Sequence, residues 1–423
     1  MDGPFWGPDF AALQRGDPEI ADIVLGELDR LRGGIQLIAS ENLASPAVLA
    51  ALGSTLTNKY AEGYPDRRYY TGCGPADAAE ELAIERAREL FGAEHANVQP
   101  HSGSSANLAC YAALAEPGDT VLAMSLPHGG HLTHGSPVNF SGRWFDTVSY
   151  HVRQDTETID YDEVRDLARA HRPRVVIAGA TAYPRLIDFA AFRQIADEVG
   201  AYLLVDAAHL IGLVAGGVIP SPVPYADVVS FSTHKVLRGP RGGMILCRAD
   251  LADRIDRAVF PFLQGGPMMH VIAAKAVALG EAMRPEFGRY AGQVVANAVA
   301  LAAGLAEMGM RPVSGGTDTH LALLDLTELE VTGAQAEHRC EALSITVGKY
   351  AVPFDPNPPR VASGIRVGTS AVTTQGMAEP EMKEIAGLLT RAVREPAPEP
   401  ELAAAVASLA RRFPAYPREP RRA

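Results

Sequence analysis

Short apolar runs alternate with amphipathic stretches through most of the chain. The apolar runs predict strands at 118–124, 174–180, 201–206, 227–233 and 243–248. The stretches between them predict helices at 75–92, 104–115, 160–171 and 188–199. Strands that alternate with helices form parallel sheets covered on both faces, so the pattern predicts a mostly parallel α/β domain.

The pattern changes at both ends of the chain. Residues 1–45 read as an N-terminal arm, with an amphipathic helix from about Pro18 to Leu31. Arg284-Pro285-Glu286 interrupts the preceding helix and marks a boundary, because proline ends a helix. We therefore expect three parts: the arm 1–45, a large domain 46–283 and a smaller C-terminal α/β domain 284–423.

Composition excludes several classes of partner. The net charge of −12 and pI near 5.5 argue against nucleic acid or an anionic membrane as the main partner. No apolar stretch is long enough to span a bilayer, and no secretory signal opens the chain. The four cysteines show no metal-ligand spacing, which is typical of a reducing cytoplasm.

The predicted strand 227–233 leads directly into Thr233-His234-Lys235 and a turn rich in glycine and arginine at 238–243. Only five of the 38 basic Lys and Arg residues are lysines, so a lysine placed behind a strand is notable. A lysine held there, beside a loop able to cradle an anion, can form a Schiff base with an aldehyde cofactor. The alternative is a strand-end lysine that reaches solvent.

A second predicted strand delivers a carboxylate to the same kind of position. Residues 201–205 are apolar and run straight into Asp206. A buried carboxylate is costly unless it is paired, and the pyridinium nitrogen of pyridoxal phosphate is such a partner. A helix cap is the alternative for Asp206 alone. Asp206 and Lys235 on successive strand ends together favour pyridoxal phosphate.

A phosphate seat is also predicted. A short strand at 96–100 is followed by Ser102, Gly103 and Ser104, which open the helix at 104–115. Open N–H groups and the helix dipole favour a dianion at such a terminus. Alone this is ordinary capping chemistry. In this order, before Asp206 and Lys235, it indicates a cofactor phosphate site.

Together with further motifs, these features give the chain a resemblance to the serine hydroxymethyltransferases, a family of fold-type I pyridoxal phosphate enzymes. The matching stretches are 37–42, 58–65, 68–70, 128–135, 233–235, 264–267 and 363–369. The resemblance implies a large domain with a mostly parallel seven-stranded sheet and a smaller C-terminal α/β domain.

The resemblance also implies roles for individual residues. The catalytic set would be Lys235, Glu62, His131, Asp206 and Tyr70. Pyridoxal phosphate, covalent on Lys235, would contact Ser102, Gly103, Ser104, His131, Thr181, Asp206, His209, His234, Tyr60, Gly265 and Gly266. The amino acid would contact Ser40, Tyr70, Glu62, His209 and Arg366. Tetrahydrofolate would contact Leu126, Gly130, Leu132, Tyr69 and Tyr350.

Three further points concern these residues. Arg366 stands between glycines in a strand, where its planar fork can reach a carboxylate; a structural ion pair is the alternative. His128 and His134 are interpreted as turn and core hydrogen-bonding groups, and no metal site is expected from this histidine cluster. In the family, the residues matching Tyr60, Glu62, Gly265 and Gly266 serve the neighbouring subunit's site, which implies a homodimer with shared sites, or a tetramer.

The implied reaction interconverts L-serine and glycine, with a one-carbon fragment passed to tetrahydrofolate and Glu62 as the base. The folate side departs from the family: Gly348-Lys349-Tyr350 replaces the usual Asn-Lys-Asn, Arg360 replaces a common aromatic residue, and Thr71 a usual glycine. Losing a polar contact costs roughly 1–3 kcal/mol, so folate should bind more weakly. We expect the binding and cleavage of the amino acid to be unaffected, because the amino acid and the pterin are taken to occupy different walls of the active site.

Two alternatives stay open at this point. One is a specialised paralogue, either an α-methylserine hydroxymethyltransferase with D-alanine as acceptor or a folate-independent L-threonine transaldolase or aldolase. The other is an inactive scaffold or binding protein that retains the fold. Turnover of serine, α-methylserine and threonine with and without folate separates these readings.

Overall fold

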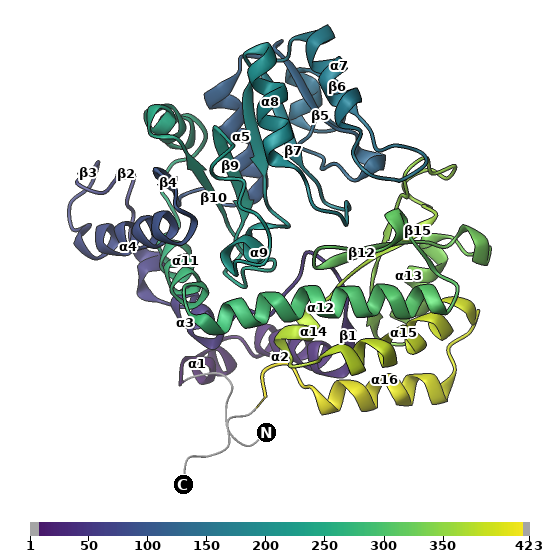
Figure 1. The fold of residues 1–423 in the computed structure, drawn as a ribbon. Coiled ribbons are helices and arrows are strands. Elements are labelled where there is room, and N and C mark those ends of the chain that lie inside the picture. The colour runs from purple at the N-terminus through teal and green to yellow at the C-terminus, as the bar shows by residue number, and fades with distance from the viewer. Residues whose placement is uncertain (1–7, 418–423) are drawn as a thin grey trace.

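A computed structural model describes residues 8–417 as two α/β cores joined by a long helix (Figure 1). The larger core holds a seven-stranded sheet. In spatial order its strands are β4 (His95–Asn97), β10 (Gly243–Cys247), β9 (Val228–Ser232), β8 (Tyr202–Asp206), β7 (Val175–Gly179), β5 (Thr120–Met124) and β6 (Asp146–Tyr150). The pairs from β9 to β6 are parallel, and β10 runs antiparallel to both neighbours. The predicted mostly parallel seven-stranded sheet is confirmed.

Helices cover both faces of this sheet, so its central strands β7, β9 and β10 are buried along their whole length and mostly apolar. One face packs on α4 (Gly74–Phe91), α7 (Tyr161–His171), α8 (Phe189–Val199) and α11 (Met269–Ala282). The other packs on α5 (Gly103–Leu114) and α10 (Ala252–Arg257). The strand β6 escaped the sequence pattern because it lies at the sheet edge, where its residues are only partly buried.

The helix α12 (Pro285–Glu307) runs from the larger core to the smaller one (Figure 1). The smaller core is an antiparallel sheet in the order β11 (Arg311–Pro312), β12 (Leu321–Asp325), β15 (Gly364–Gly368) and β14 (Gly348–Tyr350). Its apolar side packs against α12, α13 (Gly333–Glu341), α15 (Glu379–Arg394) and α16 (Pro400–Arg412). The start of α12 at Pro285 agrees with the position of the break in the sequence pattern, although the domain limits stay our interpretation.

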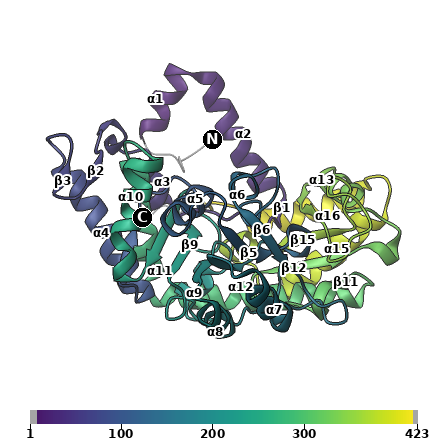
Figure 2. The ribbon, with the colours of Figure 1, turned by 90° about the horizontal axis from the view of Figure 1, so that it is seen from above.

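The N-terminal segment is attached to the smaller core. Its helices α1 (Pro8–Gly16) and α2 (Pro18–Gly33) stand away from the body of the molecule in Figure 2. The strand β1 (Ile35–Gln36) then pairs in parallel with β13 (Ile345–Thr346). Ile35 and Leu37 lie in the apolar core of the C-terminal part. Residues 1–7 of the predicted arm lie outside the described residues.

The remaining elements are short and connect the larger ones. They are α3 (Pro46–Leu52), the hairpin of β2 (Gly63–Tyr64) and β3 (Arg67–Arg68), α6 (Phe140–Trp144), α9 (Ile211–Ala215), α14 (Ser370–Thr374), a π-helical segment at Ala258–Leu263 and several 3-10 turns. Between residues 8 and 417, no helix combines the length and apolar character that crossing a membrane requires.

Candidate active site

Two strand ends place the central pair of side chains. Asp206 is the last residue of β8, and Lys235 follows the end of the adjacent parallel strand β9, with Asp206 opposite Ser230 in the register. Parallel neighbours end at the same edge of a sheet, so the two charged groups meet there. Both side chains are buried. The expectation from the sequence that these two residues share a site agrees with the geometry.

Asp206 is held as a carboxylate by a hydrogen-bond network. Its Oδ2 accepts from Asn107 Nδ2 at 2.7 Å and lies 3.1 Å from His134 Nε2, and its Oδ1 accepts from the Ala208 N–H. Burial alone would raise the pKa of Asp206, but the hydrogen bonds from His134 and Asn107 and the electrostatic influence of His134 and His131 together outweigh burial and hold that pKa well below its usual range. An ionised aspartate in this place is suited to a protonated ring nitrogen.

His131, His134 and Asp206 bring ligand-type atoms within 4.8 Å of one another. Their bonding argues against reading them as a metal centre, because His134 is paired with Asp206 and His131 Nδ1 lies 2.7 Å from Thr133 Oγ1. Burial lowers the pKa of His131 to about 4, so its ring is neutral near pH 7. A neutral flat ring is suited to stack on an aromatic cofactor.

Lys235 is prepared for nucleophilic chemistry. Burial lowers the pKa of Lys235 to about 8; the charge of Asp206 opposes this shift, and Arg366 and Arg241 reinforce it. A lowered pKa increases the fraction of free amine near neutral pH, and the free amine is the form that attacks a carbonyl. The neighbouring His234 has a pKa lowered to about 4 by burial, and its Nδ1 is buried with no partner in the described chain.

The predicted phosphate seat is the N-terminus of α5. Ser102 is the N-cap and forms a reciprocal capping box with Ser105. Across residues 8–417 no acceptor is bonded to the N–H groups of Gly103 and Ser104, which stay open to an anion. A side chain on Gly103 would collide with Ser232 Oγ, so glycine lets this terminus approach the end of β9 without displacing that hydroxyl.

Arg366 enters the site from the smaller core, on β15. Its side chain is buried, its Nη1 donates to the carbonyl of Thr181 at 2.6 Å, and its Nε has no partner. No carboxylate in residues 8–417 forms an ion pair with it. Its guanidinium carbon instead lies 4.1 Å from the ring centroid of Tyr350. A buried cation without a counter-charge is costly, which indicates an anionic ligand.

Two stacked histidines, His209 and His320, lie between the active site and the N-terminal segment that carries Ser40. The rings of His209 and His320 lie 5.3 Å apart, and His209 Nδ1 is 3.1 Å from His320 Nε2. His320 Nε2 lies 3.2 Å from the carbonyl oxygen of Ala39, the residue before Ser40. Burial lowers the pKa of both rings, that of His320 to about 3, so neither carries charge near pH 7.

A second group of predicted site residues gathers around the exposed ring of Tyr60. Tyr60 and Tyr70 meet edge to face at 5.5 Å, and both are about half exposed. The charge of Glu62 raises the pKa of Tyr70. Gly265 lies against Glu62 and Gly266 against the ring of Tyr60. Among the described residues, no hydrogen bond or ion pair connects this group with Lys235, Asp206 or Arg366.

The predicted folate residues lie in two places. Leu126, Gly130 and Leu132 lie on the segment after β5, where the Gly130 carbonyl accepts from Thr181 Oγ1. Thr181 in turn accepts from Arg366, on which Tyr350 lies, so a chain of contacts joins Gly130 to Tyr350. Tyr69 is exposed and packs on Phe260 beside the second group.

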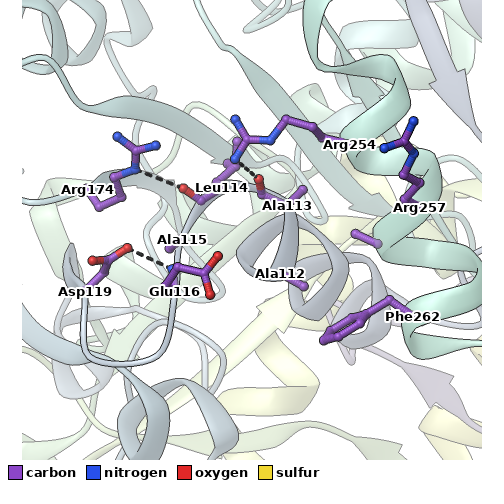
Figure 3. A pocket seen from close by; sticks show the side chains of 11 residues that line it. Ala112, Ala113, Leu114, Ala115, Glu116, Asp119, Arg174, Arg254, Arg257 and Phe262 are labelled. Carbon is purple, nitrogen blue, oxygen red and sulfur yellow. Dashed lines mark hydrogen bonds between the residues drawn. The ribbon is translucent and has the colours of Figure 1, made fainter.

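A polar pocket of about 560 Å³ lies elsewhere, at the C-terminal end of α5 (Figure 3). Figure 3 shows Arg174 and Arg254 aimed at that helix end, where they donate to the carbonyls of Leu114 and Ala113. Cations near the last carbonyls stabilise a helix. The first helical residue that lines this pocket is Ala112, about 15 Å along the helix axis from Ser102, and no predicted site residue lines the pocket.

Sequence reasoning missed Asn107 and His320. Asn107 bonds Asp206 and Thr133 and accepts from Ser230, so it ties three elements together. The available sign was a buried amide in a helix of small and apolar residues, one turn after Ser104. His320 offered only its place just before a strand, which does not reveal a stacking partner 111 residues away.

Comparison with known proteins agrees with this geometry. A family model described as "Serine hydroxymethyltransferase" matches residues 13–389. The chain is also 58% identical, over 408 residues, to a curated serine hydroxymethyltransferase of Desulforapulum autotrophicum, which covers 96% of this chain and 98% of that protein. A family model and a close relative that each match nearly the full length leave one assignment: the chain belongs to the serine hydroxymethyltransferase family.

Proposed function

We propose that this protein interconverts L-serine and glycine, with tetrahydrofolate as the carrier of the one-carbon unit. The observation that carries the amino-acid assignment is the buried Arg366, which has no carboxylate partner in the described chain and lies within electrostatic reach of Lys235. A small amino acid bound there would neutralise that guanidinium and bring its amino group to the lysine. The family and the named relative support the same reaction.

As a member of this family, the protein uses pyridoxal phosphate, which supplies an electron sink when the Cα–Cβ bond breaks. The residues fit this group. Ser102, Gly103 and Ser104 would hold the phosphate through open N–H groups, as described above. Asp206, ionised, would hold the ring nitrogen in its protonated form, and Lys235 would carry the covalent attachment.

The remaining steps belong to side chains that bind and move protons. Arg366, assisted by Ser40 and His209, would hold the carboxylate of the amino acid. His131, neutral and fixed by Thr133, would lie against the cofactor ring. Glu62 would accept the proton from the hydroxymethyl group of serine, because a carboxylate can act as a general base. For this it must lie within hydrogen-bond reach of that hydroxyl.

In the part of the chain that the structure describes, no hydrogen bond or ion pair joins Glu62, Tyr60 and Tyr70 to Lys235, and we propose that these three residues complete the site of a second copy. Large aromatic side chains exposed together, as here, are typical of a surface that another protein covers. The active unit would be a homodimer with shared sites, or a tetramer built from such dimers. A cytoplasmic location remains our prediction.

The test is a substrate panel. L-Serine, α-methylserine and L-threonine are each supplied with and without tetrahydrofolate, and methylenetetrahydrofolate, glycine and aldehyde are measured. We expect saturable turnover that requires both serine and folate. Threonine cleavage without folate, combined with no serine turnover at high folate, would instead identify an aldolase or transaldolase. Absence of any turnover, with the cofactor bound, would identify an inactive scaffold.

A further inference from the structure

The ring of Tyr350 lies on the guanidinium of Arg366, with 4.1 Å between the ring centroid and Cζ. The pair spans two antiparallel strands. Gly348 stands directly opposite Arg366, and Tyr350 stands opposite Gly364, two residues away on the same face. Diagonal neighbours of this kind are within reach of an aromatic side chain.

Gly348 lies beside the ring. A Cβ added at Gly348 would be in ordinary van der Waals contact with two ring carbons of Tyr350, at 3.7–3.8 Å, so a side chain longer than a methyl group would compete with the ring for this space. The intervening Lys349 faces away and pairs with Glu337. The two departures from the family pattern at 348 and 350 are therefore neighbours: the tyrosine supplies the ring, and the glycine places no side chain beside it.

The stack has a specific effect on Arg366. The guanidinium is buried, one nitrogen is bonded to the Thr181 carbonyl, and Nε has no partner in residues 8–417. An aromatic face in contact stabilises a desolvated cation and restricts the plane of the guanidinium. Because the Tyr350 ring fixes the plane of the Arg366 guanidinium and the Thr181 carbonyl fixes one of its nitrogens, the directions of the remaining N–H groups are fixed as well.

We propose that Tyr350 is a positioning residue for the carboxylate of the amino-acid substrate: it orients Arg366 for bidentate binding, and Gly348 leaves room beside its ring. The inference rests on the proposed function, in which Arg366 binds that carboxylate. From the sequence, the pterin and the amino acid are expected to occupy different walls of the site. Tyr350, predicted on the pterin side, contacts Arg366 on the amino-acid side, so the inference connects the two walls.

The experiment measures binding to the holoenzyme in the absence of folate, so that a pterin contact contributes nothing. Glycine is titrated against the change in cofactor absorbance, and methylamine, which is glycine without its carboxylate, serves as the paired ligand. Tyr350→Leu and Tyr350→Asn should weaken glycine by about five- to thirtyfold, the range of a desolvated cation–π contact, and leave methylamine within about twofold. Tyr350→Phe keeps the ring and should bind glycine as the wild type does.

Two further variants separate the possible causes. Gly348→Asn should weaken glycine in the same way without altering Tyr350. Tyr202→Leu removes a tyrosine that Arg174 covers at 4.9 Å, at the opposite end of β8, and should leave glycine binding unchanged. Equal glycine affinity in wild type and Tyr350→Leu would overturn the inference.

The Arg366→Lys variant separates this inference from the proposed function. If Arg366→Lys weakens glycine but Tyr350→Leu does not, only the role of Tyr350 is wrong. If Arg366→Lys leaves glycine unchanged, the carboxylate assignment itself is wrong. If both substitutions weaken glycine binding, Tyr350→Leu should reduce glycine affinity less in the Arg366→Lys background than in the wild type. The reason is that Tyr350 acts through Arg366, and the effects of contacting residues are not additive.

Discussion

Lys275 is the second buried lysine of the chain, and replacing it by methionine tests how the phosphate seat is held. The side chain on α11 is 1% exposed. Its Nζ donates to the carbonyls of Val98, Pro100 and Gly243 at 2.6, 3.0 and 2.8 Å. An ammonium has three donors, so the match with these three acceptors is complete.

The magnitude follows from the groups left behind. Methionine has a similar shape and no donor, so three buried carbonyls each lose the hydrogen bond from the ammonium, at a cost of roughly 1–3 kcal/mol per bond. Pro100 O keeps its bond from the Gly243 N–H, which limits the cost at that carbonyl. Removing a buried ammonium also removes its desolvation cost, which offsets part of the lost hydrogen bonding. The free energy of unfolding should therefore fall by about 2–4 kcal/mol. This destabilisation should extend to the predicted phosphate seat at Ser102, because Gly243 donates to Pro100 O and lies against the Ser102 carbonyl.

Hydrogen exchange measures this locally. At about pH 6, where Lys275, whose pKa burial lowers to about 7, is mainly charged, amides of β10 should exchange roughly 30-fold faster or more in Lys275→Met. The affinity of the apoprotein for pyridoxal phosphate should fall as well. Lys383→Met makes the same chemical change at an exposed position and serves as the control. Exchange in β10 that matches this control would refute the reasoning.

Three other predictions follow from the site. Borohydride reduction followed by peptide mapping should place the cofactor on Lys235, and Lys235→Ala should bind it without a covalent bond; a label on another lysine would contradict the assignment. Mixing inactive Glu62→Gln with inactive Lys235→Ala should restore part of the activity if sites are shared, whereas hybrids that form but stay inactive would exclude sharing. Burial lowers the pKa of His128, His131 and His234 to about 4, against 6.5 for an ordinary histidine. The unfolded chain therefore binds more protons between these values, so stability should be full above pH 6.5 and decline as the pH falls toward 4. A thermal midpoint that stays constant from pH 7 to pH 4.5 would contradict these shifts.

Much of the central site was readable from the sequence, because it depends on a local pattern and one topological rule. An apolar run that ends in Asp206, and another that leads to Lys235, predict strand ends. Parallel strands in a covered sheet place such ends at one edge, so proximity follows without coordinates. The α5 terminus at Ser102 was predictable for the same reason, since capping residues act within one turn.

The partners of these groups depend on contacts between distant segments, which no local pattern specifies. Asn107 reaches Asp206 across 99 residues, and His320 reaches His209 across 111. The exposed position of Tyr60, with Glu62 against Gly265, also required the fold, since sequence order says nothing about which chain's site they face.

The sequence by itself determined the class of sheet, the order of the predicted cofactor-binding residues and the family resemblance. These features follow from hydrophobic periodicity and short motifs, which are local properties of the chain. Only the tertiary structure decided what Tyr350 contacts. From its position alone it replaced a folate-binding residue, yet its ring lies on Arg366. The physical reason is that diagonal contacts in an antiparallel sheet depend on the register between β14 and β15, and that register is set by the packing of the whole C-terminal core.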